Sequence, residues 1–253
     1  MRLRLLFAVV ALLAWIASGS AHAQQAVNGE TFTLAPGGRA TITFESFCLD
    51  YGKRFPDDIG LPPRGLADPP VRGVLSYALA QGYTSSDPKE VQFAIWQVRG
   101  AAGAPQPGAI GREIAQAARA VAPPAGATSL LDALDAGDVT LTAGSWQGIG
   151  EQLTINNFND YFQGRGELVV ENTSDRELTL YMPVGTVFPA PGDEFQSMAG
   201  YATEVVVEHP QQAMPDTGVT DLFNMTQLVL LSLLALDIAA IGWLIQRRVA
   251  QCF

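Results

Sequence analysis

The sequence predicts an α+β fold in which a short N-terminal β-hairpin and two to three helices pack with an antiparallel β-sheet or small β-sandwich. Apolar and polar residues alternate near the N-terminus, helical patterns bounded by turn residues lie between residues 71 and 121, and period-two alternation returns after residue 124. Two hydrophobic segments at the ends of the chain lie outside this fold. A C-terminal transmembrane helix is therefore expected in addition.

The N-terminal hydrophobic segment is typical of a secretory signal peptide. Arg2 and Arg4 precede a short apolar run, which ends before Ala21-His22-Ala23. An uncleaved anchor is the alternative, but the apolar run is short for a membrane span. Residues 1–23 are expected to be removed.

The C-terminal hydrophobic segment, residues 222–245, predicts a membrane-spanning helix. Its apolar residues contribute about −5 kcal/mol to insertion, more than the roughly +3 kcal/mol cost of Asp237. Arg247 and Arg248 follow it and place residues 246–253 in the cytoplasm, since positive residues stay inside. The body of the protein is then on the extracellular side.

The predicted hairpin joins residues 31–34 to residues 40–44. Both runs alternate apolar and polar residues, and Pro36-Gly37-Gly38 separates them with a turn sequence. A helix over residues 71–81, ended by Gly82, and a modest helix over residues 111–121 are also expected.

The best-defined helix of the sequence begins at Pro88. Asp87 is placed as its N-cap, Pro88 as its first residue and Glu90 as the partner of a capping box, while Gly100 follows its last turn. This arrangement fixes the position of the next residues in the helix, including Gln92.

The region after residue 124 predicts about five short strands. These lie at residues 139–141, 153–155, 168–170, 178–181 and 203–207. We therefore divide the exported part into a Cys/Gln region, residues 24–125, and a β-rich lobe of the same ectodomain, residues 126–209. Residues 210–221 form a stalk.

Composition excludes several classes of protein. The chain has 15 basic and 25 acidic residues and a formal net charge of −10, which argues against a nucleic-acid partner. Two cysteines and two histidines leave little material for a metal site or a disulfide framework. No metal and no cofactor are expected.

Cys48 is the one cysteine of the exported part, because Cys252 lies beyond the predicted membrane helix. A buried, unreactive thiol is one explanation for it. A cysteine-dependent hydrolase is disfavoured, since His209 alone remains as a histidine and lies beside the stalk.

Two sequence segments suggest a reactive role for Cys48. Phe47-Cys48-Leu49-Asp50 and Val91-Gln92-Phe93-Ala94-Ile95-Trp96 resemble the two signature segments of the bacterial surface thioester domain of Gram-positive adhesins. The resemblance implies that the Cys48 sulfur bonds to the Gln92 side-chain carbonyl with loss of ammonia, and that Trp96 and Phe47 shield the bond. The spacing of 44 positions is shorter than in characterised members, and Val91 replaces a frequent threonine.

The predicted helix places Gln92 in its first turns. Free N–H groups at this positive end of the helix dipole are expected to polarise the Gln92 carbonyl and to hold the oxyanion of a tetrahedral intermediate.

A further resemblance concerns the stalk. Met214-Pro215-Asp216-Thr217-Gly218, an apolar segment and an arginine-rich tail resemble the cell-wall sorting signal of sortase substrates, with Met214 in place of leucine. The resemblance implies that a sortase cuts between Thr217 and Gly218. An ordinary Pro/Gly turn before a single-pass helix is the alternative.

These observations predict a surface-anchored, adhesin-like protein at the outer face of the membrane or in the cell wall. Its partners are a surface amine of a protein or other ligand, a sortase, and the membrane through the C-terminal helix. The bond forms once per chain, so the protein is not expected to be an enzyme. The alternative is a noncovalent or structural cell-envelope protein with a buried, unreactive Cys48.

Overall fold

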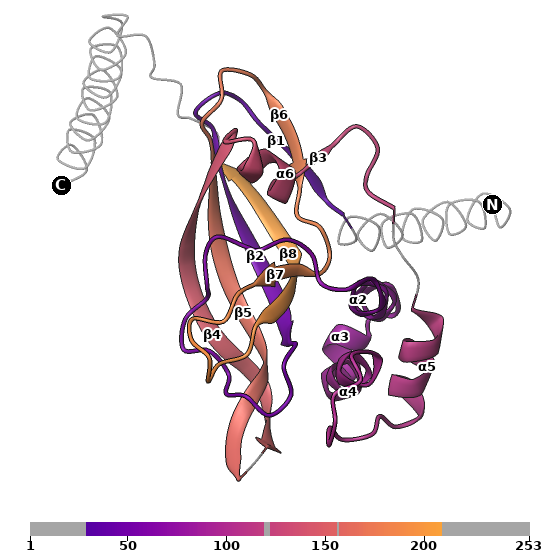
Figure 1. Cartoon of the computed structure of the whole chain (residues 1–253). Coiled ribbons are helices and arrows are strands. Elements are labelled where there is room, and N and C mark those ends of the chain that lie inside the picture. Colours follow the sequence, from indigo (N-terminus) through magenta and orange to yellow (C-terminus); the bar gives the residue numbers. More distant parts are fainter. Residues whose placement is uncertain (1–28, 119–121, 156, 209–253) are drawn as a thin grey trace, which may run out of the picture. The chain divides into compact units, whose positions relative to one another are not determined.

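The computed structural model describes residues 29–118, 122–155 and 157–208 (Figure 1). The predicted signal peptide, stalk, membrane helix and cytoplasmic tail lie outside these residues, as do His209 and the sorting-like motif from Met214 to Gly218. Among the helices of the described ranges, none has the length and apolar character needed to cross a bilayer.

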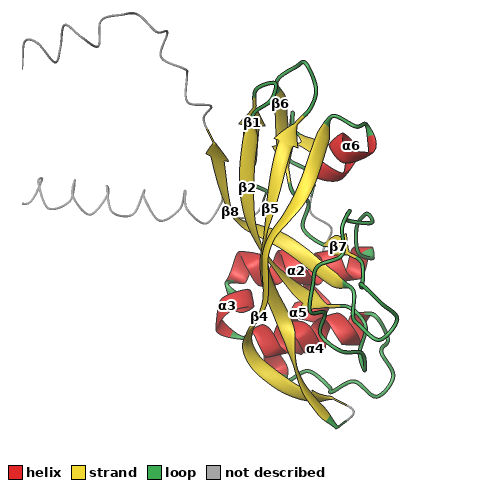
Figure 2. Cartoon of the chain, turned by 90° about the vertical axis from the view of Figure 1, so that its left-hand side faces the viewer, coloured by secondary structure: helices red, strands yellow, loops and turns green. Residues whose placement is uncertain are grey.

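The described residues form two sheets. The larger has five strands in the order β4-β5-β2-β8-β7, and every neighbouring pair is antiparallel. Figure 2 shows its long strands running the length of the domain. Its central strand, β2, carries Cys48 at its last position. The strands are β2 (Arg39–Cys48), β4 (Val139–Ile155), β5 (Phe158–Asn172), β7 (Thr186–Phe188) and β8 (Met198–Glu208).

The smaller sheet has the order β1-β6-β3 and consists of β1 (Thr31–Leu34), β6 (Leu178–Tyr181) and β3 (Thr128–Ser129). Its β1–β6 pair is antiparallel, whereas β3 runs parallel to β6. The expected α+β class is thus confirmed, with two sheets in which antiparallel pairing dominates.

The predicted N-terminal hairpin is wrong, although both of its strands exist. β1 pairs with β6, while β2 pairs with β5 and β8. The turn between them does not close a hairpin because its backbone bonds to another strand: Gly37 N donates to Asn172 O at 2.9 Å, and Asn172 N donates to Gly38 O at 2.9 Å. Each of the two strands therefore pairs with strands distant in the sequence and not with the other.

The five short strands of the prediction are parts of longer ones, except for residues 178–181, which match β6. Residues 139–141 and 153–155 are the two ends of the single strand β4. Its register against β5 shifts between Ala143 and Trp146 and again between Ile149 and Gln152. These irregularities interrupt the alternation on which the prediction relied.

The described residues hold five helices, more than the two to three predicted: α2 (Pro69–Gln81), α3 (Tyr83–Ser86), α4 (Pro88–Val98), α5 (Ala109–Ala117) and α6 (Leu130–Asp135). Figure 1 shows α2 to α5 grouped beside one end of the larger sheet, near the end of β2. Gly82 and Gly100 end α2 and α4 with φ of 76° and 68°, values that favour glycine.

The capping box predicted for α4 is absent from the structure. Pro88 is the first helical residue, but the Asp87 side chain makes no cap hydrogen bond. Asp87 Oδ2 instead accepts a bond from Ser86 Oγ at 2.6 Å, and Glu90 Oε2 accepts one from Gly111 N at 2.9 Å. Glu90 therefore joins α4 to the start of α5 rather than closing its own helix.

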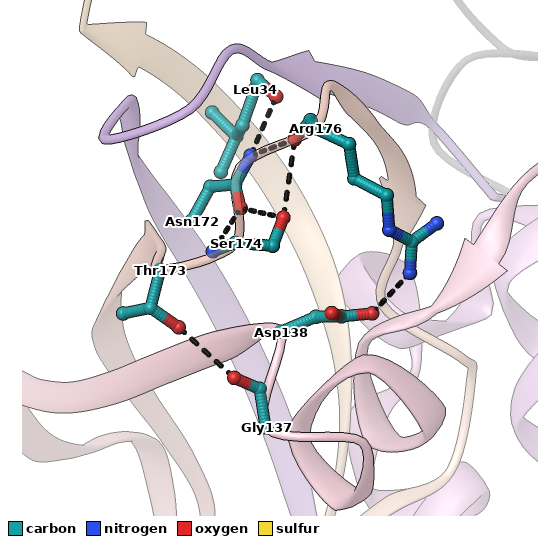
Figure 3. A network of polar contacts seen from close by, with 7 residues as sticks. All are labelled: Leu34, Gly137, Asp138, Asn172, Thr173, Ser174 and Arg176. Carbon is teal, nitrogen blue, oxygen red and sulfur yellow. Dashed lines mark hydrogen bonds and ion pairs between the residues drawn. The ribbon is translucent and has the colours of Figure 1, made fainter.

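Asn172 connects the two sheets at the far end of β5 (Figure 3). Its Nδ2 donates to the carbonyls of Leu34, Ala35 and Arg176 at 2.8–3.1 Å, and its Oδ1 accepts from Ser174 N and Oγ at 3.0 and 2.7 Å. The chain leaves β5 here and enters β6 of the other sheet. The carboxamide thus fixes the crossing point between the sheets.

Candidate functional site

Cys48 lies where β2 separates from β5. The register of this pair ends at Phe47 and Gln163, whereas the pairing with β8 continues to Cys48 and Met198. Leu49 N donates to Ser197 O, on the β8 side, at 2.9 Å. Since successive backbone groups of a strand point to opposite edges, the N–H and C=O of Cys48 face the side from which β5 has departed.

The side chain of Gln92 occupies this position. Cys48 N donates to Gln92 Oε1 at 3.0 Å, and Gln92 Nε2 donates to Cys48 O at 2.8 Å. Both residues have zero exposed surface. The carboxamide therefore continues the hydrogen bonding of β2 where its pairing with β5 stops, and it brings the two signature segments together across 44 positions of sequence.

The Cys48 sulfur lies against residues of two other strands. Sγ is 3.6 Å from Met198 Sδ on β8 and 3.9 Å from Tyr161 O on β5. The same residue thus presents the sulfur and, through its N–H, a hydrogen-bond donor for the Gln92 carbonyl. This donor comes from the strand, whereas the sequence had suggested the free N–H groups of the helix.

Burial raises the pKa of the Cys48 thiol well above its ordinary value, and the nearby carboxylates of Asp160 and Asp50 raise it further. The backbone holds both acids in place: Phe55 N donates to Asp160 Oδ2 at 2.8 Å, and Ser197 N donates to Asp50 Oδ2 at 3.0 Å. A free Cys48 is consequently a neutral thiol at pH 7. This is the opposite of what a thiolate-dependent hydrolase requires.

Trp96 lies one turn beyond Gln92 on α4 and is fully buried. Its ring centroid is 4.9 Å from that of Tyr51, edge to face, and 6.0 Å from that of Phe93. Its Nε1 has no hydrogen-bond partner among the described residues. Trp96 therefore contributes to a packed aromatic layer on the helix that carries Gln92.

Phe47, the other expected shield, faces away from the sulfur. Neighbouring residues of a strand point to opposite faces, and the Phe47 ring stacks on Tyr201 with centroids 6.4 Å apart. Met198 Sδ and the Tyr161 backbone carbonyl lie against the sulfur instead. Sequence reasoning missed both of them because they lie 150 and 113 positions from Cys48 and no local pattern marks them.

Tyr77 and Tyr83, which lie between the two signature segments in the sequence, both contact Glu113. The hydroxyl of Tyr77 donates to Glu113 Oε1 at 2.8 Å, and that of Tyr83 lies 3.4 Å from the same oxygen. These exposed bonds link α2 and α3 to α5. The ring of Tyr51, as described, packs against Trp96.

Within the described ranges, no three His, Cys, Asp or Glu side chains gather in a way that could hold a metal ion. In the comparisons with known proteins, no family model, no curated protein and no solved structure matched the chain. The geometry of the site and the sequence motifs therefore indicate its function.

Proposed function

We propose that this protein is a surface-anchored, adhesin-like protein that carries an internal Cys48–Gln92 thioester and bonds covalently to a target amine. The observation that carries the proposal is the pair of reciprocal hydrogen bonds between the Gln92 carboxamide and the Cys48 backbone, in a site with no exposed surface. These bonds hold the acyl group next to the residue that bears the nucleophile, as an intramolecular reaction needs.

The bond-forming step is an acyl transfer within the chain. The Cys48 sulfur attacks the Gln92 side-chain carbon, and the Cys48 N–H, 3.0 Å from Oε1, stabilises the negative charge that develops there. The thiol proton passes to the departing nitrogen, which leaves as ammonia. The product keeps the bond from the Cys48 N–H to the carbonyl and loses the bond from Nε2 to Cys48 O.

The second step joins the protein to its target. A primary amine attacks the Gln92 carbonyl, the carbon–sulfur bond breaks, and the sulfur takes up a proton as the Cys48 thiol. The resulting amide does not dissociate, so adhesion is not subject to the limits of noncovalent affinity. Each chain reacts once.

The surface location belongs to the same proposal. It rests on the signal peptide expected at residues 1–23, the membrane helix expected at residues 222–245 and the sorting-like motif that includes Thr217 and Gly218. These segments would hold residues 24–213 on the outside of the cell, where a target amine is accessible and a thioester has a use.

A structural cell-envelope protein is the second candidate, and one observation favours it. The two hydrogen bonds between Gln92 and Cys48 also satisfy buried polar groups and attach α4 to β2. In this case the thiol remains free and packs as a small apolar group.

Incubation of the purified full chain with methylamine separates the two candidates. The proposal predicts an adduct on Gln92, located by peptide mass spectrometry, and one newly titratable thiol at Cys48 for each adduct. Cys48→Ala and Gln92→Ala should each abolish the adduct. Gln196→Ala is the matched control, because Gln196 is equally buried but its Nε2 donates to Lys53 O at 2.8 Å. A wild-type chain that forms no adduct and has a free thiol would support the structural candidate.

A further inference from the structure

A second feature of the molecule is a cavity of about 90 Å³ between the first half of α2 and the segment that follows β6. Arg72 and Ser76 line it from the helix, and Tyr181, Met182 and Val184 line it from the other side, with Leu66 at its edge. None of the acidic side chains of the described residues lines the cavity. Although the chain has a net charge of −10, the one charged side chain among the described residues that line the cavity is the cation Arg72.

Arg72 is not paired with any carboxylate within the described ranges. Its Nε is buried and has no hydrogen-bond partner there. The aliphatic part of the side chain packs over Gly185, where an added Cβ would come within 2.6 Å of Arg72 Cγ. The guanidinium is therefore held at the cavity wall at the cost of an unsatisfied buried donor.

Two hydroxyl groups accompany it. Ser76 and Tyr181 are only 6% and 8% exposed, and neither side chain has a hydrogen bond in the part of the chain that the structure describes. Burial, followed by the nearby carboxylate of Asp132, raises the pKa of Tyr181, so its hydroxyl keeps its proton at neutral pH. Three side chains with unused donors, two from α2 and one from the end of β6, thus line one cavity.

We propose that Arg72, Ser76 and Tyr181 form a binding site for a carboxylate group carried on a small apolar substituent. The planar guanidinium matches a carboxylate in a bidentate geometry, and hydroxyl donors complete the set. Met182 and Val184 give the remaining wall an apolar character that suits an alkyl group. A phosphate dianion is a poorer match, because its two negative charges would face a single guanidinium. The small volume of the cavity also favours the smaller carboxylate group.

The same chemistry occurs in a free organic acid and at the C-terminus of a peptide. Propionate represents the first, and N-acetylalanine represents the second. Stronger binding of N-acetylalanine than of propionate would indicate a peptide terminus, and the reverse order would indicate a free acid. Both results support a carboxylate site.

The test is a ligand-observed NMR titration of the purified full chain with propionate, propionamide and inorganic phosphate. Propionate should bind and propionamide should not, since the amide keeps the shape and loses the charge. Arg72→Met should weaken propionate binding about tenfold or more, because a charge-assisted bond is lost while the apolar stem is kept. Ser76→Ala and Tyr181→Phe should weaken it less.

Arg64→Met is the control for the change in net charge, since Arg64 is exposed and does not line the cavity. It should bind propionate as the wild type does. Equal binding of propionate and propionamide, absence of propionate binding, tighter binding of phosphate, or unchanged binding by Arg72→Met would each overturn the proposal. Circular dichroism checks that Arg72→Met folds; if it does not, unchanged binding by both Ser76→Ala and Tyr181→Phe would overturn it.

Discussion

Asn172 and Gln92 are both buried carboxamides that bond to the backbone, with 1% and 0% of their surfaces exposed, yet their surroundings differ. Asn172 contacts four other residues through five hydrogen bonds and ties the end of β5 to β1 and to the start of β6. Gln92 makes two hydrogen bonds, and both go to the backbone of Cys48.

The difference separates a structural amide from a candidate reactive one. At Asn172 both polar side-chain atoms make more than one hydrogen bond: Nδ2 donates to backbone carbonyls, and Oδ1 accepts from two atoms of Ser174. At Gln92 one donor hydrogen and one acceptor lone pair have no partner among the described residues, and the single partner residue carries a thiol. A buried amide needs no cysteine beside it to serve as a structural connection.

The largest expected effect follows from removing the Asn172 amide. Asn172→Ala leaves several buried backbone groups without partners, so the free energy of unfolding should fall by about 3 kcal/mol or more. Urea unfolding measures it, with Asn159→Ala as the control, because Asn159 is exposed and, among the described residues, its Oδ1 accepts only from Thr154. A loss smaller than the difference in stability between Gln92→Ala and Cys48→Ala would contradict the stronger structural role assigned to Asn172.

Neither Gln92→Ala nor Cys48→Ala can form the thioester, so the difference between them isolates the two hydrogen bonds of Gln92. Gln92→Ala should be about 2 kcal/mol less stable than Cys48→Ala, since only Gln92→Ala leaves the N–H and C=O of Cys48 buried and unpaired. The same urea series measures both. Equal losses for the two variants would contradict a role for Gln92 in holding the strand end.

The dependence of stability on pH distinguishes a free thiol from a bonded one. A free Cys48 has a pKa raised above its unfolded value, so its contribution is present below about pH 8.5 and is lost as pH rises beyond it. Gln92→Ala has a free thiol, so its stability should fall above this pH relative to the Gln92→Ala, Cys48→Ala double variant.

For the wild type, a thioester removes the titrating group. Its stability relative to Cys48→Ala should therefore stay constant across the same pH range in urea unfolding. Tyr201, whose pKa is also raised by burial and by Glu45, is present in every variant, so its contribution cancels in these differences. A decline for the wild type equal to that of Gln92→Ala would indicate a free thiol.

The smallest effect is expected at the start of α4. Asp87→Ala should change the free energy of unfolding by less than about 0.5 kcal/mol, because its side chain makes no cap bond. Glu90→Ala should cost about 1 kcal/mol, since Gly111 N loses its acceptor, and Glu90→Gln should restore most of this. A larger loss from Asp87→Ala than from Glu90→Ala would reverse this assignment.

Local patterns in the sequence predict the elements of this fold better than their partners. The ends of α2 and α4 follow from Gly82 and Gly100, and residues 178–181 match β6. The pairing of β1 with β6 does not follow, because the bonds between Gly37 and Asn172 join positions distant in sequence. The capping box of α4 also cannot be predicted from local sequence, because Glu90 bonds to Gly111 N at the start of α5.

In the candidate site, too, local motifs predict some features, while others depend on residues distant in sequence. The motifs predict that Cys48 and Gln92 are neighbours, and the structure places them in reciprocal hydrogen bonds. Sequence reasoning assigned the carbonyl's donor to the helix and the shield to Phe47, whereas the structure has the Cys48 N–H as donor and Met198 beside the sulfur. Strand register determines both features, and register is set by the whole sheet.

The central claim is a covalent bond between Cys48 and Gln92, and the mass of the purified chain tests it most directly. We predict that the wild type is lighter by one ammonia than its own sequence between its observed termini, and that proteolysis recovers the Cys48 and Gln92 peptides as one linked species. Cys48→Ala and Gln92→Ala should show the full masses of their sequences. A wild type of full mass, with Cys48 labelled by a thiol reagent after unfolding, would contradict the thioester.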